Sequence, residues 1–149
     1  MRIVNRHFQR EYEAVDTFEA GVMLTGPEVK SLRAGNLRLD QAFVKIIDGE
    51  AFLFNAEIPI YRFARPTEYE ATRMRKLLLH KNEIIKLETK LKSGGRLTII
   101  PDVCYTKGRR IKLSIALVKA RGEIAKKKIE RAEDIKRKQK QEMKEYMKK

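Results

Sequence analysis

The side chains that could perform catalysis or bind a metal are few and scattered along the chain. There is one cysteine, Cys104, and there are two histidines, His7 and His80. A nucleophilic cysteine needs a nearby base and a zinc site needs several ligands at a recognisable spacing, and the sequence offers neither pattern. Cys104 lies in a segment with β-type alternation, so we expect a small buried apolar residue. Glu19 and Glu28 would form an acid and base pair only if the fold joined them, which their spacing does not predict. The sequence therefore predicts neither an enzyme nor a metal or cofactor site.

Basic side chains dominate the remaining chemistry. Lys and Arg number 34 against 20 Asp and Glu, a net charge of +14, and half of this excess lies in residues 119–149. Lys and Arg neutralise phosphates and release condensed counterions, so the expected partner is a nucleic acid or an anionic membrane surface. The length of 149 residues suits one domain, and a single cysteine excludes an intramolecular disulfide. No apolar stretch is as long as a signal peptide or a membrane span, so we expect a cytoplasmic protein.

The segment 120–149 is expected to be a basic arm that can form a helix. Residues 123–149 contain no Gly or Pro and consist mostly of good helix formers, enough for a helix of about 40 Å at ~1.5 Å per residue. The apolar stripe of this helix is thin and is interrupted at Lys136 and Gln139, whereas a helix on a membrane surface needs a broad apolar face. The pattern favours a nucleic acid partner, and a solvated helix without a specific partner is the alternative.

Turn chemistry and period-two alternation predict two β-hairpins. Asp48-Gly49 tolerates the positive φ values of a two-residue turn and lies between two apolar segments. A second hairpin is expected around a turn at residues 106–108. Alternation in the strand after this turn places Leu113 in the core and Lys112 in solvent.

A further strand and two helices complete the predicted fold. Residues 12–24 are expected to form a strand that is interrupted near Gly21. One helix should begin near Pro27 and stop at Gly35, and another should span about residues 80–92. Strands with two short helices in a chain of this length predict a mainly β fold, a small antiparallel barrel flanked by helices. The oligonucleotide-binding (OB) type of barrel is the expected kind.

A long run in the first quarter of the chain closely resembles the core motif of a known family. Residues 18–35 read FEAGVMLTGPEVKSLRAG, and three other segments agree in order and spacing, namely 5–12, 48–55 and 73–84. These residues resemble the SsrA-binding protein family, also called small protein B, over residues 5 to about 122.

The resemblance implies a fold for each part of the chain. Residues 1–119 should form a closed, six-stranded, antiparallel OB-like barrel with flanking helices. Residues 120–149 should form the basic, potentially helical tail. Family members commonly have an aromatic residue or a histidine and then Asp-Lys-Arg after the segment matching Ala120-Arg121-Gly122, and this chain has neither the aromatic or imidazole group nor the aspartate there. The charge and helical potential of the tail are retained.

The resemblance implies an RNA-binding adaptor and not an enzyme. Members of the family bind the tRNA-like domain of transfer-messenger RNA (tmRNA, or SsrA RNA) and deliver it to stalled 70S ribosomes, for ribosome rescue and for tagging of incomplete peptides by trans-translation. The implied partners are this RNA, elongation factor Tu with GTP on the same RNA, and the ribosome at its decoding centre and mRNA channel. We expect a monomer that has no cofactor, no metal and no membrane partner.

Three positions match the family's RNA-binding residues: Glu19, Leu78 and Lys112. An exposed leucine can stack on an unstacked base, a carboxylate can accept hydrogen bonds from base amino groups, and a lysine can contact phosphates. Spacing and charge add further candidates for RNA binding, which are Asn5, Arg6, Lys30, Arg33, Arg73, Arg75 and Lys76. The tail residues expected to contact the ribosome are Lys126, Lys127, Lys128, Arg131, Lys136, Arg137 and Lys138.

Two other classes of function fit part of this pattern. A barrel-type ribosomal or RNA-chaperone protein would share the basic charge and the fold, but it would bind ribosomal RNA or single strands without preferring a tRNA-like domain. An RNA-modifying enzyme would need a cluster of acid, base or metal-binding groups.

Overall fold

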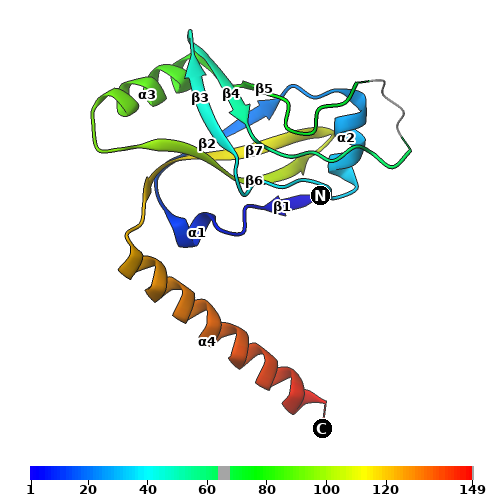
Figure 1. Ribbon diagram of the computed structural model, residues 1–149, viewed down its shortest axis with the longest axis vertical. Helices are drawn as coiled ribbons and strands as arrows, with labels where there is room; N and C mark the ends of the chain where they lie inside the picture. The colour runs from blue at the N-terminus through cyan, green and yellow to red at the C-terminus, as the bar shows by residue number, and fades with distance from the viewer. Residues whose placement is uncertain (64–67, 149) are drawn as a thin grey trace.

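The protein is a mainly antiparallel β structure with flanking helices and a long carboxyl-terminal helix (Figure 1). The computed structural model describes residues 1–63 and 68–148. The elements in chain order are β1 (Arg2–Val4), α1 (Phe8–Glu11), β2 (Tyr12–Val22), α2 (Gly26–Arg33), β3 (Phe43–Ile47), β4 (Glu50–Phe54), β5 (Arg75–Leu78), α3 (Lys81–Lys92), β6 (Thr98–Lys107), β7 (Arg110–Ala120) and α4 (Glu123–Met147).

The strands pair in the order β1-β6-β3-β4-β5-β2-β7, and β6 also pairs with β7. Every pairing is antiparallel. Within residues 1–63 and 68–148 the sheet thus has seven strands, whereas six were expected. The additional strand is β1, which joins the edge of β6 through pairs such as Ile3 with Cys104.

Both predicted hairpins are confirmed. Asp48 and Gly49 form the turn between β3 and β4 with φ values of 51° and 75°, the left-handed conformation that a two-residue turn requires. Strands β6 and β7 form the second hairpin, and Lys107 pairs with Arg110. Its turn is therefore Gly108-Arg109, slightly later than expected, because the ladder continues through residues 106 and 107.

The predicted interruption of β2 at Gly21 is wrong. The strand runs unbroken from Tyr12 to Val22, and its irregularity lies between Ala14 and Asp16, where the register with β7 shifts. Gly21 serves a different purpose. A Cβ atom at this position would lie 3.3 Å from the Cβ of Leu78, so the glycine allows β5 and β2 to hold that leucine close.

The core forms where the inward faces of the strands meet. Leu113, Ile115 and Leu117 of β7 are all buried there, as the alternation predicted. Cys104 belongs to the same cluster and is 2% exposed, which confirms its expected role as a small apolar residue. Burial raises the pKa of its thiol to about 12, so the nucleophilic thiolate is scarce at neutral pH.

The two short helices are confirmed near their predicted positions. Helix α2 begins with a capping box in which the backbone N–H of Glu28 donates to Thr25 Oγ1, while the backbone N–H of Thr25 donates to Glu28 Oε1. Gly35 follows this helix with a φ of 87°, as a glycine stop requires. Helix α3 packs through Leu87, which is fully buried.

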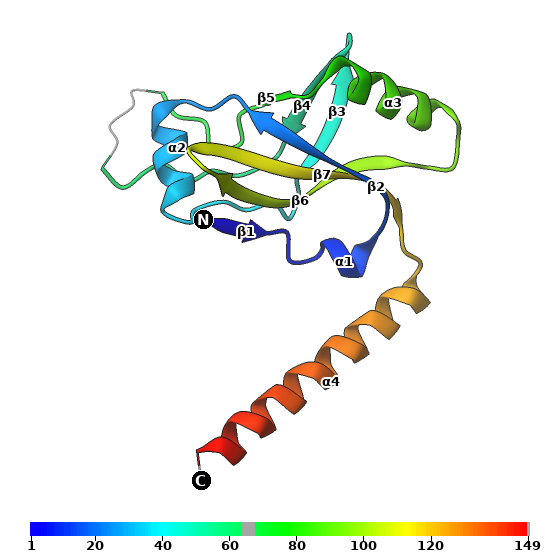
Figure 2. The same ribbon diagram turned by 180° about the vertical axis from the view of Figure 1, so that it is seen from behind.

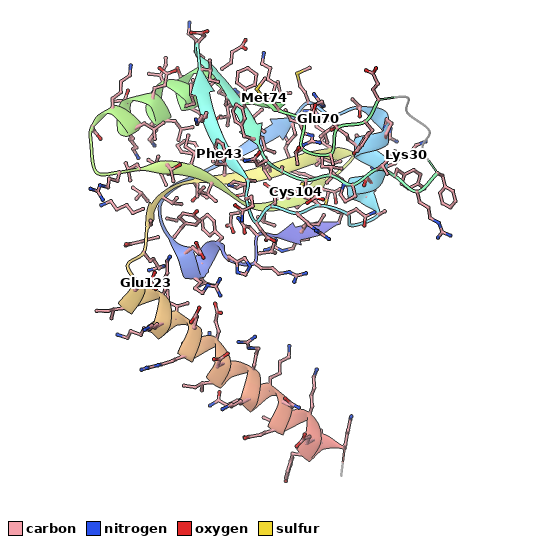
Figure 3. All side chains as sticks on the ribbon, viewed as in Figure 1. Lys30, Phe43, Glu70, Met74, Cys104 and Glu123 are labelled. Atoms are coloured by element: carbon pink, nitrogen blue, oxygen red, sulfur yellow. The ribbon has the colours of Figure 1, made fainter. Side chains whose placement is uncertain are left out.

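Helix α4 extends away from the β structure, as both views of the ribbon show (Figures 1 and 2). None of its residues is buried, and its side chains project outward all along its length from Glu123 (Figure 3). The predicted helical arm is confirmed, although Lys149, the last residue of the expected tail, lies outside the described residues. Within the described ranges, no helix is both long enough and apolar enough to cross a membrane.

The start of α4 is held by the amino-terminal segment. Arg121 donates from Nε to the carbonyl oxygens of Gln9 and Tyr12, at 3.0 and 3.1 Å. The guanidinium of Arg10 lies 3.3 Å from the carboxylate of Glu130, in a solvent-accessible pair.

Candidate nucleic-acid interface

Three strands bring the family-matched residues together in one groove. Glu19 on β2, Leu78 on β5 and Lys112 on β7 all line a groove of about 610 Å³. They are 34 or more positions apart in the sequence, so the sheet alone unites them.

The register of the sheet explains this meeting. Gly21 pairs with Leu78 on one side and with Lys112 on the other, so these three residues form one row across β5, β2 and β7. Because Gly21 has no side chain, the row has a low centre between a leucine and a lysine. Glu19 lies two residues along β2 and so projects from the same side. The glycine in the middle strand thus leaves the centre of this row open.

Glu19 is held as a carboxylate. The hydroxyl of Tyr105 donates to its Oε2, and Lys107 Nζ lies 3.3 Å from its Oε1. The hydrogen bond from Tyr105 lowers the pKa of Glu19, and the charges of Lys107 and Lys112 act in the same direction. The same bond raises the pKa of Tyr105 to about 12. The groove thus presents an oriented, ionised acceptor that suits the amino or imino group of a base.

Leu78 supplies an apolar surface in this polar setting. It is 53% exposed, although its neighbour Leu77 is 2% exposed in the core. An exposed leucine beside a lysine and a carboxylate is a surface on which an unstacked base can lie while its backbone contacts the cation.

The groove contains cations that the sequence reasoning missed. Arg109, in the turn between β6 and β7, and Arg110, the first residue of β7, both line it. The backbone carbonyl of Arg109 accepts a 3.2 Å hydrogen bond from the guanidinium of Arg33. Tyr105 and Lys107, the partners of Glu19, were also missed. A signal was available, because Lys107, Arg109, Arg110 and Lys112 are concentrated around one two-residue turn.

The structure corrects the assignment of Arg75. This residue is fully buried, where its guanidinium cannot reach RNA. Its Nε donates to Glu28 Oε2 at 2.7 Å, and its two terminal nitrogens donate to the carbonyl oxygens of Ala56 and Ala71. The basic side chain is an internal link between α2, β5 and the segment before β5. Alternation along β5 directs it inward, between the outward residues Met74 and Lys76.

Asn5 also has a structural position. It is 5% exposed, its Nδ2 donates to the carbonyl oxygen of Pro101 at 3.0 Å, and its backbone N–H donates to that of Asp102. These bonds hold the amino-terminal segment against β6, so its side chain is not offered to an RNA surface. The adjacent Arg6 is exposed.

The other candidates lie on the surface but not all in the groove. Lys30 and Arg33 are exposed on α2. Arg73 is partly exposed and donates to Glu28 at 2.7 Å. Lys76 is two residues from Leu78 on β5, and its Nζ lies 3.2 Å from a carboxylate oxygen of Glu50. The tail residues all lie on α4, away from the groove, and comprise Lys126, Lys127, Lys128, Arg131, Lys136, Arg137 and Lys138.

The groove therefore combines groups that suit binding to a nucleic acid. In residues 1–63 and 68–148, no three His, Cys, Asp or Glu side chains gather as a metal site would require. A cationic rim, an exposed leucine and an oriented carboxylate are features of a nucleic-acid-binding protein.

The comparisons with known proteins agree with this class. The family model described as SmpB protein matches residues 2–145. The SsrA-binding protein of Persephonella marina is 42% identical over 133 residues, which cover 89% of this chain and 87% of the relative. That of Thermosynechococcus vestitus is 42% identical over 146 residues, 97% of this chain and 92% of the relative. The chain belongs to the SmpB family.

A solved structure supports the same assignment. A chain described as "tmRNA-SmpB: a journey to the center of the bacterial ribosome" superposes with a TM-score of 0.68 and 36% sequence identity. The match covers 82% of this chain and 85% of that chain.

Proposed function

We propose that this protein is the adaptor that binds the tRNA-like domain of transfer-messenger RNA and accompanies it to stalled ribosomes in trans-translation. The observation that carries the proposal is the meeting of Glu19, Leu78 and Lys112 in one groove. The family relatives are named for binding SsrA RNA, and the similar solved chain is described with tmRNA and the bacterial ribosome. Apolar, acidic and cationic groups side by side suit an exposed RNA loop, whose bases are accessible, better than a continuous duplex.

The strand order supports a closed barrel. Strands β6, β3, β4, β5, β2 and β7 pair in succession, and β7 pairs again with β6. We propose that these six strands form the closed OB-like barrel and that β1 is an addition to its edge. Residues 1–119 would then bind RNA as one unit, and residues 120–149 would be a separate basic arm.

The tail has a distinct role in this proposal. Its basic residues would contact the ribosome at the decoding centre and along the empty mRNA channel, while the groove selects the RNA. Elongation factor Tu with GTP would occupy the same RNA molecule. The protein would act as a monomer in the cytoplasm.

Competition between RNAs at fixed salt tests the proposed function. We expect transfer-messenger RNA to displace a labelled tRNA-like domain more effectively than either bulk tRNA or an unstructured RNA of equal length. Salt must be held constant because phosphate contacts make affinity steeply salt-dependent. Equal competition by all three RNAs would contradict the adaptor function and favour a general RNA chaperone.

Filling the low centre of the groove should weaken RNA binding. In Gly21→Val the new side chain meets Leu78 and occupies the space between it and Lys112, so we expect a loss of about tenfold in affinity for the tRNA-like domain, which corresponds to ~1.4 kcal/mol. Valine suits a β-strand, so the fold should persist. The measurement is RNA titration together with thermal unfolding. Thr17→Val, at an exposed position of the same strand, is the control and should bind normally.

A further inference from the structure

The outer face of β3, β4 and β5 has an aromatic ring between two lysines. Phe52 pairs with Lys45 on one side and with Lys76 on the other, so these residues form one row across three strands. The chain neighbours of Phe52 are Ala51 and Leu53, which are 1% and 4% exposed in the core. Alternation therefore directs Phe52 outward, where it is only partly covered.

The next row across this face contains two stacked aromatic rings. Phe43 and Phe54 pair across β3 and β4, and their rings stack with centroids 5.3 Å apart and planes 8° from parallel. The ammonium of Lys45 lies 5.5 Å from the centroid of Phe43. Phe43 is anchored at its other side against the cluster that contains Phe8. The stacked rings are therefore held in place, with Phe43 packed against this cluster.

Charge indicates which ligand this face suits. Lys45 is exposed. The side chains of Lys76 and Glu50, which form an ion pair, are 40% and 51% exposed. An ion pair this exposed contributes little to stability, so a phosphate can replace the carboxylate of Glu50 beside Lys76. The acidic residues nearby, Asp48 and Glu50, lie at the hairpin end of the face. Aromatic rings with flanking lysines are the combination that binds unpaired nucleotides, since every base has a π-face and every linkage a phosphate.

The face is continuous with the groove. Lys76 and Leu78 alternate on β5 and so project from the same side, and Leu78 is one of the residues that line the groove. We propose that the outer face of β3, β4 and β5 is a second RNA contact, at which an unpaired base stacks on Phe52 and its phosphates contact Lys45 and Lys76. This inference rests on the proposed function, because the occupant is a further part of the same bound RNA.

A tryptophan reporter tests the stacking directly. The natural chain contains no tryptophan, so Phe52→Trp places a single reporter at the proposed contact. Adding the tRNA-like domain of transfer-messenger RNA to the full-length protein should quench its emission as a base stacks on the ring. Ile85→Trp, an exposed position on helix α3 and outside this face, is the matched control and should be quenched much less. Equal emission with and without RNA in Phe52→Trp would overturn the proposal.

Affinity measurements separate this contact from the groove. Phe52→Ala should weaken binding of the same RNA by about tenfold, within the range known for loss of one stacked base, with thermal unfolding as the check on folding. Lys45→Gln and Lys76→Gln should each reduce the slope of log affinity against log salt by about 1, whereas Lys92→Gln on α3 should not. If Lys112→Gln loses affinity and Phe52→Ala does not, the second contact is wrong and the proposed function stands. If the wild-type protein shows no preference for transfer-messenger RNA, the proposed function itself fails.

Discussion

Replacing Glu28 with alanine is expected to lower the free energy of unfolding by about 3–5 kcal/mol, the usual cost of removing one partner from a buried ion pair. Glu28 is 1% exposed and Arg75 is fully buried, and their side chains are joined at 2.7 Å. The alanine would leave the guanidinium of Arg75 in the interior without its counter-charge. It would also remove the acceptor for Arg73 and for the backbone N–H of Thr25.

Denaturant unfolding measures this loss, and two further variants make it specific. Glu50→Ala removes the exposed partner of Lys76 and should cost less than about 1 kcal/mol. Adding Arg75→Met to Glu28→Ala should recover part of the stability, because the unpaired buried charge is gone. Equal stability of Glu28→Ala and Glu50→Ala would show that the buried pair is energetically unimportant.

The same carboxyl group makes stability depend on acid pH. Burial raises the pKa of Glu28, but hydrogen bonds from Arg73, the Thr25 backbone and Arg75 together outweigh it, so the folded pKa lies below the ordinary value. A group whose folded pKa is depressed contributes stability above its unfolded pKa and loses it as the pH falls through the folded pKa. The difference in the free energy of unfolding between wild type and Glu28→Ala should therefore be largest near neutral pH and should shrink in acid.

A fragment that ends at Gly122 is expected to bind transfer-messenger RNA nearly as well as the full chain but to fail in tagging on stalled ribosomes. Helix α4 buries none of its residues and contributes no side chain to the groove, so its removal leaves both the core and the groove intact. The fragment loses a net charge of +5, so some loss of affinity is expected at low salt. RNA titration and a reconstituted tagging reaction measure the two outcomes separately.

A full-length variant tests whether the tail acts through its positive charge. Changing Lys126, Lys127 and Lys128 to glutamine keeps a helix-compatible sequence and removes three positive charges. If the tail acts by electrostatic contact with ribosomal RNA, this variant should tag more slowly than wild type, and the difference should shrink as salt rises because salt weakens the contact in the wild type. Normal tagging by the Gly122 fragment would show that the tail is dispensable and that its proposed role is wrong.

Local patterns predicted the elements that local physics controls. Asp48-Gly49 specified a turn because both positions adopt positive φ, and alternation after the second turn correctly placed Leu113 inside and turned Lys112 outward, on the side that proved to be the groove. Gly21 was misread because a glycine in a strand suits a bend and a close contact equally well. Its neighbour across the sheet, Leu78, is 57 positions away, and no local signal connects the two.

By itself, the sequence determined the charge, the resemblance to the SsrA-binding protein family, and a mainly β body followed by a basic helix. These depend on composition and on short-range periodicity, which a chain carries before it folds. The tertiary structure decided which charges are available. Arg75 and Lys76 are adjacent in the chain, yet one is sealed in the core against Glu28 and the other is on the surface beside Phe52. The reason is that pairing across strands fixes both the direction and the partner of each side chain, and those partners come from distant parts of the chain.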